Sequence, residues 1–205
     1  MREAAAERRV LAGFIVTAAV AVFGVVASGI VVLSGAAREQ LEQPSGSGLP
    51  PEVVDGIMRA TEIGLPVFSL LYPFAWWVLV AALMQFVTRF FAGSGPFAAM
   101  LAVIGVAQLP LAISGLLQVL ISGSQAALGV QSTAGAALGF AGTMVGLVFF
   151  VWHVALVVIG ASHARNIGYG ESTGSCAISC VGILLLLLLL AIIVGVGAAF
   201  VFGGA

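Results

Sequence analysis

The sequence predicts an all-α protein, a polytopic membrane bundle of five transmembrane helices. Of its 205 residues, 61% are hydrophobic and 7% are charged, whereas soluble domains carry about 25% charged residues. Charges are absent from four long segments, and a spanning helix needs about 20 apolar residues. These segments are 10–33, 65–88, 96–160 and 172–205. The third is long enough for two crossings. A charge at mid-membrane costs about 2.5–3.5 kcal/mol, so these uncharged segments indicate membrane-spanning helices.

The apolar segments place the expected helices at 10–34, 65–89, 97–121, 134–160 and 175–202. The first has basic residues before it and small residues after it, as a secretory signal does. A signal's apolar region spans about 7–15 residues, however, and this one is longer. We therefore interpret it as an uncleaved first crossing.

The chain accordingly divides into an N-terminal transmembrane helix (1–34), an external loop with a short surface helix (35–64) and a four-helix membrane domain (65–205). The loop contains a linker rich in Pro, Ser and Gly at 44–51. Pro51 and the acidic residues Glu52 and Asp55 suit the first turn of a short helix. A tight turn is expected from Ser122 onward, between the third and fourth crossings.

Arginines set the predicted orientation, because positive charge is enriched in cytoplasmic loops. All seven basic residues are Arg, and the net charge is −1. With five crossings, one side holds Arg2, Arg8, Arg9, Arg89 and Arg165, and the other holds Arg38 and Arg59. The N-terminus is therefore expected in the cytoplasm and the C-terminus outside.

The sequence has no basic patch of the kind that would suggest nucleic-acid binding. The absence of Lys, with abundant Ala, Gly and Val, indicates a GC-rich prokaryotic genome.

Amide side chains follow one face of the third expected helix. The face consists of Gln108, Gly115, Gln118, Ser122 and Gln125. Buried amides in lipid need hydrogen-bond partners, so this face is expected to point into the bundle. It either bonds to neighbouring helices or forms a polar path for a solute. Pro110 on the same helix, and Pro66 and Pro73 on the second, are expected to produce kinks.

Small residues repeat on the fourth expected helix. Its stripe consists of Gly135, Gly139, Gly142 and Gly146, and His153 and Gly160 continue the same face. Such GxxxG spacing allows two helices to approach closely, and the amide face of the third helix is the expected partner. His153 either hydrogen bonds within the bundle or acts as a proton relay or ligand.

Cys176 and Cys180 lie at the cytoplasmic start of the fifth expected helix, and His163 precedes them. We expect reduced, dispensable thiols that pack as small side chains. The alternative is a metal site. The sequence contains no nucleotide-binding loop, nucleophile elbow or paired carboxylates. We therefore expect no cofactor and no enzymatic activity.

Two stretches of the chain are familiar from a known family. One is VTRFFAGSGPF at 87–97, which leads into AVIGVAQLP at 102–110. The other is VWHVALVVIG at 151–160, followed by His163-Ala164-Arg165. Over residues 65–200 the chain resembles the Yip domain family, which is named for interaction with Ypt/Rab GTPases. That resemblance implies five crossings, a cytoplasmic N-terminus and a non-enzymatic role.

Eukaryotic members of that family act in vesicle trafficking and carry a long cytoplasmic N-terminal region with an Asp-Leu-Tyr-Gly-Pro motif. The motif is absent here, and few residues precede the first expected helix. Rab GTPase binding is therefore not carried over. The expected role is membrane organisation, or assembly with membrane proteins or with itself, in the cell membrane. The alternatives are a small-solute or ion transporter using the amide face and His153, and a metal-dependent enzyme at His163, Cys176 and Cys180.

Overall fold

The computed structural model describes residues 2–35, 51–129 and 132–202, and all its regular elements are helical. They are α1 (Arg2–Leu33), α3 (Pro51–Thr88), the 3₁₀ turn η1 (Arg89–Phe91), α4 (Phe97–Ala107), α5 (Leu109–Leu128), α6 (Thr133–Arg165) and α7 (Tyr169–Phe202). Among the described residues, five helical spans are long and apolar enough to cross a membrane, and one of them consists of α4 and α5 together. The all-α class and the five crossings are thus confirmed. The orientation of the termini stays a prediction.

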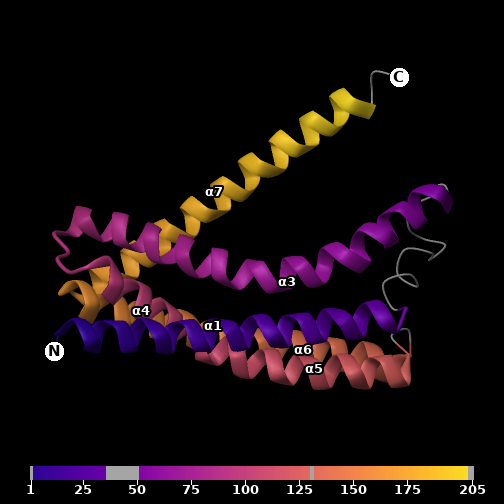
Figure 1. Cartoon of the computed structure of the whole chain (residues 1–205), viewed down its shortest axis with the longest axis horizontal. Coiled ribbons are helices and arrows are strands. Elements are labelled where there is room, and N and C mark those ends of the chain that lie inside the picture. The colour runs from indigo at the N-terminus through magenta and orange to yellow at the C-terminus, as the bar shows by residue number, and fades with distance from the viewer. Residues whose placement is uncertain (1, 36–50, 130–131, 203–205) are drawn as a thin grey trace.

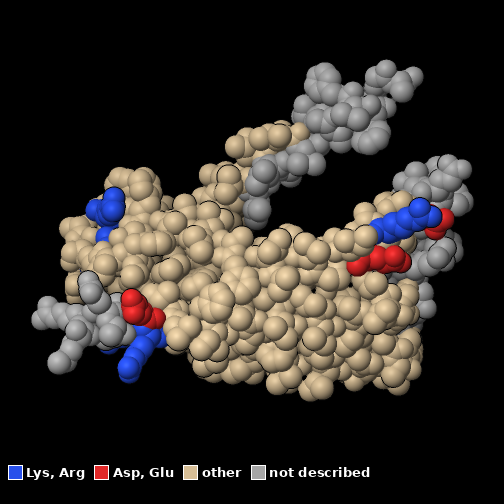
Figure 2. Space-filling view, in the orientation of Figure 1, with Lys and Arg blue, Asp and Glu red and all other residues tan. Residues whose placement is uncertain are grey.

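The long helices run side by side, and α1 lies among them (Figure 1). It contacts α3, α4 and α5, while α5 pairs with α6. Helix α7 contacts α3 and α6 near its start and then leaves the bundle, so that its C-terminal half stands apart (Figure 1). The start of α1, the α3–α4 turn and the α6–α7 junction all lie at one end, which we call the turn end. Charged side chains of both signs are visible at this end and at the opposite one, and the surface between them shows none (Figure 2).

The third crossing differs from the single helix expected at 97–121, because it breaks at Gln108 into α4 and α5. Pro110 explains the break, since its ring displaces the preceding turn and its nitrogen has no hydrogen to donate. The Gln108 N–H accordingly bonds to Gly105, three residues back, at 3.2 Å. Pro66 and Pro73 leave α3 continuous, and that helix curves along its length (Figure 1).

The turn expected from Ser122 onward begins later than expected, because α5 remains helical to Leu128. The Ser124 hydroxyl donates to the Leu120 carbonyl at 2.9 Å. A serine that bonds one turn back within its own helix does not interrupt that helix. The structure instead leaves the helical conformation at Gly129, which has a φ of +82°.

The region 35–64 also differs from expectation. Residues 36–50, which include most of the linker at 44–51, lie outside the described residues. From Pro51 onward the expected short helix is present, but it continues without a break into the second crossing, as α3. The division expected at residue 64 therefore falls inside one helix. A single helical glycine such as Gly64 costs only about 1 kcal/mol, which is too little to end it.

The buried core lies between α3, α4, α6 and α7, and includes Met84, Met100, Ile104 and Val157. Helices α1 and α4 approach closely at Gly13 and Gly105. A Cβ on Gly105 would lie 2.6 Å from the Gly13 Cα, so only glycine fits there. Trp77 packs beside this crossing, and its indole N–H donates to the Leu101 carbonyl at 2.7 Å.

Candidate functional site

The guanidinium of Arg165 holds the α3–α4 turn against the end of α6. Arg165 is the last residue of α6 and is only 2% exposed. Its Nε donates to the Thr88 hydroxyl at 3.0 Å, and its two terminal nitrogens donate to the Gly93 and Gly95 carbonyls. A buried cation is costly unless its donors are satisfied, and arginine presents five of them in a fixed planar fork. We call Arg165, Thr88, Gly93 and Gly95 the Arg165 junction.

The glycines of the junction are required by close approach. A Cβ on Gly93 would lie 2.7 Å from the Thr88 carbonyl oxygen. Gly95 has a φ of +139°, and a Cβ there would overlap the Ala164 carbonyl. The turn also bonds in the other direction, because the Ser94 N–H donates to the Arg165 carbonyl at 2.9 Å. Side chain and backbone together fix the turn.

Arg165 was expected to be one of several cytoplasmic charges, and its burial was not predicted. One signal was available. The junction joins 87–97 to 163–165, and these are two of the stretches on which the family resemblance rests. When two segments that are far apart in the chain both carry the resemblance to one family, they are candidates for contact in space.

The amide face of α5 meets the glycine face of α6. The Gln118 Nε2 donates to the Gly142 carbonyl, and the Gln125 Nε2 to the Gly135 carbonyl, both at 2.9 Å. We call these four residues the Gln–Gly contact. Both amides reach backbone oxygens of α6 because the glycines have no side chain in the way.

Glycine is the residue that leaves room for these amides. A Cβ on Gly142 would lie 3.3 Å from both the Gln118 Oε1 and the Ile121 Cδ1, and one on Gly139 would lie 2.9 Å from the Gln125 Nε2. Gly146 is less crowded, with 3.8 Å to the Gln118 Nε2. Gly115 faces α1 instead, where a Cβ would lie 3.1 Å from Phe23. The expected polar face is thus divided between two neighbouring helices.

His153 lies at the break between α4 and α5. This residue is 7% exposed, and its Nδ1 lies 2.7 Å from the Ala107 carbonyl oxygen. A carbonyl only accepts, so in this bond Nδ1 carries the proton. Pro110, on the other side of the break, is fully buried. Gly160 lies two turns after His153, and a Cβ there would overlap the Val103 side chain.

Gln108 is the exception among the interior amides. It is 2% exposed, and neither its oxygen nor its nitrogen has a hydrogen-bond partner in the described part of the chain. It lines a cavity of about 250 Å³ together with Tyr72, His153 and Ser179. A buried amide without a partner is costly, and a cavity of this size is large enough to hold water.

The residues of the metal hypothesis do not form a cluster. Cys176 is buried and Cys180 is exposed, and both thiols are free. Each of them also borders the Gln108 cavity. His163 is exposed, with its Nδ1 2.8 Å from the Ile159 carbonyl one turn back. Within the described ranges, no three His, Cys, Asp or Glu side chains come together as metal ligands do.

The comparison with protein families gives a match to the Yip1 domain over residues 1–201. This range contains the Arg165 junction, the Gln–Gly contact and His153. Searches of curated proteins and of solved structures gave no match.

Proposed function

Because this chain belongs to the Yip1 domain family of membrane proteins, we propose that it works by assembly with other membrane proteins or with itself, and not by moving a solute. The observation that carries the proposal is the use of its interior polar groups. Gln118, Gln125 and His153 each bond to a backbone carbonyl of another helix. A solute path needs polar atoms that are free to exchange partners, whereas these hold helices together.

The surface that we propose for a partner is the separated part of α7. The small-residue face of α6 is already turned toward α5, so it is not available. The described part of α7 that stands apart in Figure 1 exposes large apolar side chains, namely Leu184, Leu185, Leu188, Leu189, Ile192 and Ile193. A span with few neighbours of its own is suited to pack against a helix of another chain.

Family membership supports a non-enzymatic role without a cofactor. We propose that the protein lies in the cell membrane and that its partner is not a GTPase. The partner is instead a membrane protein, or a second copy of this chain, that shares the bilayer.

Photocrosslinking in native membranes tests the assembly proposal. A crosslinking residue at Leu185, on the separated half of α7, should give one or a few discrete adducts that mass spectrometry identifies. The same residue at Leu147, which is exposed on α6, should give lipid adducts alone. Equal, diffuse labelling at both positions would overturn the proposed use of α7.

The proposed orientation can be tested in a chain with Cys176→Ala and Cys180→Ala, which we expect to insert normally. A single cysteine introduced at Ser94, an exposed residue of the turn, should be protected from an impermeant thiol reagent added outside. A cysteine at position 46, in the external loop, should react. The opposite pattern would reverse the orientation, and reaction at both positions would indicate mixed insertion.

A second candidate function, binding or transport of a small polar solute, is favoured by the Gln108 cavity. Its unpartnered amide faces the same space as Tyr72 and His153, and in lipid such a group costs several kcal/mol. A solute that both donates and accepts hydrogen bonds would satisfy it. Purified protein in liposomes should then release an entrapped polar solute, and Gln108→Leu should abolish the flux. Absence of flux in the wild type would contradict this function.

A further inference from the structure

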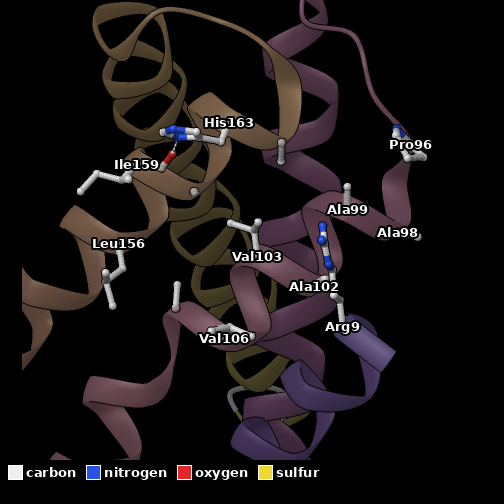
Figure 3. Close-up of a pocket in the computed structure, with 13 residues that line it drawn as sticks. Arg9, Pro96, Ala98, Ala99, Ala102, Val103, Val106, Leu156, Ile159 and His163 are labelled. Carbon is white, nitrogen blue, oxygen red and sulfur yellow. Dashed lines mark hydrogen bonds between the residues drawn. The ribbon is translucent and has the colours of Figure 1, made fainter. Parts of the chain in front are cut away.

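A groove of about 740 Å³ opens between α4 and α6 at the turn end of the bundle. Small side chains make it hollow, among them Ala98, Ala99, Ala102 and Ala164. Figure 3 shows Leu156, Ile159 and His163 of α6 on one side, and Ala99, Ala102 and Val103 of α4 on the other. The groove is therefore apolar along its walls and lies within a membrane-spanning part of the chain.

The length of the groove matches one leaflet of a bilayer. It follows α4 from Pro96 to Ala107, which is roughly 16 Å at the helical rise per residue. Half of a hydrocarbon core is about 15 Å. A hydrocarbon chain that spans one leaflet is therefore about as long as the groove, and its flexibility lets it follow the apolar walls.

Positive charge borders the groove at the turn end. Arg9 comes from α1, and its side chain extends beside Ala99 and Ala102 (Figure 3). No ion pair or hydrogen bond joins its guanidinium to another residue whose side chain the structure describes. His163 lies on the opposite wall, where its Nδ1 donates to the Ile159 carbonyl. Basic pockets between membrane helices bind anionic lipid headgroups.

We propose that the groove is a binding site for one anionic phospholipid. An acyl chain lies against Ala99, Ala102 and Leu156, and the headgroup phosphate bonds to Arg9. Arginine suits this role because its fork of N–H donors matches the oxygens of a phosphate. A neutral phospholipid fits the same apolar walls, so the charge of Arg9 determines the preference for an anionic headgroup.

Competition between two lipids tests the site. Full-length protein in detergent micelles receives equal amounts of phosphatidylglycerol and phosphatidylcholine with identical acyl chains, and native mass spectrometry counts the lipids that remain bound. The wild type should retain one phosphatidylglycerol about fivefold over phosphatidylcholine, the preference expected of one arginine at a membrane surface. Arg9→Gln should reduce the ratio to about one. Arg59→Gln, an exposed residue at the opposite end, should leave it unchanged.

A second pair of variants tests the apolar half of the site. Ala99→Leu should fill the groove and lower the retention of both lipids at least severalfold. Ala82→Leu adds the same side chain to an exposed position on α3 and should have no effect. Equal retention of the two lipids by the wild type, or an unchanged ratio in Arg9→Gln, would overturn the proposal. Normal retention by Ala99→Leu would place the lipid outside the groove and would also overturn it.

Discussion

The Arg165 junction and the Gln–Gly contact join separate segments in the same way, with a side-chain donor on a backbone carbonyl, but they differ in charge and in number of bonds. At the junction, one buried guanidinium bonds to three acceptors within a single turn. In the Gln–Gly contact, each half-buried amide bonds to one carbonyl. Removing the arginine therefore breaks three bonds at once, whereas removing one glutamine breaks a single bond to a carbonyl inside a helix.

The positions of the two contacts along the bundle explain this difference. The junction lies at the turn end, where α6 meets α7 and α3 meets α4 (Figure 1). A charge near a membrane surface is tolerated, while one at the centre is costly. Amides carry no charge and can serve deeper in the span. The comparison teaches that the permanent charge is used at a turn, whereas neutral donors serve both within the span, at Gln118, and beside the α5–α6 turn, at Gln125.

Arg165→Met should have the largest effect of the substitutions considered. It removes three charge-assisted bonds, each worth about 1.5–3 kcal/mol. The Gly93 carbonyl loses its donor, whereas the Gly95 carbonyl still accepts from Gln85. We expect a loss of at least about 3 kcal/mol, or a melting midpoint lowered by about 6–12 °C, measured by thermal aggregation in detergent. Arg165→Lys should recover only part of this loss, since an ammonium keeps the charge but lacks the planar fork.

Arg89→Gln, at an exposed arginine of the same turn, is the control and should change little. Equal midpoints for Arg165→Met and Arg89→Gln would show that the junction does not stabilise the fold.

Gly142→Leu should have the next largest effect. A Cβ alone would already lie 3.3 Å from the side chains of Gln118 and Ile121, and a leucine must push α5 away or rotate both side chains. Overpacking of this kind costs about 1–3 kcal/mol, and the Gln118 bond is lost as well. Leu147→Ala, on a side chain that is 55% exposed, should leave the melting midpoint within a few degrees of the wild type. If Gly142→Leu melts like the wild type, the Gln–Gly contact is not tight.

Parts of this comparison could be predicted from the sequence and parts could not. The five crossings follow from uncharged length, and the meeting of Gln118 with Gly142 follows from helical spacing on adjacent helices. The approach of Gly13 to Gly105 was missed, because two isolated glycines form no periodic pattern and their helices are separated in the chain. The burial of Arg165 was missed for a related reason. A lone arginine after an apolar span ordinarily indicates topology, and its acceptors are backbone carbonyls that have no sequence signature.

Gln118→Leu should have a smaller effect than Gly142→Leu. Leucine preserves much of the side-chain volume and removes one amide–carbonyl bond, which is worth about 1 kcal/mol in a membrane bundle. The melting midpoint should fall by about 2–4 °C. The double variant Gln118→Leu with Gln125→Leu should lose about twice as much if the two bonds act independently. A double variant no worse than the single one would mean that the contact opens once either bond is broken.

Gln108→Leu should have the smallest effect and provides the sharpest contrast with Gln118→Leu. The two residues share a helix face in the sequence, but Gln118 has a partner and Gln108 has none among the described residues. Replacing a buried amide that makes no bond removes a desolvation penalty, so the midpoint should stay unchanged or rise slightly. A fall as large as that of Gln118→Leu would mean that the Gln108 amide is bonded in the membrane, to water or to a solute in its cavity. The polar face would then serve two purposes, holding α5 to α6 at Gln118 and binding a solute at Gln108, and the transport alternative would gain support over assembly.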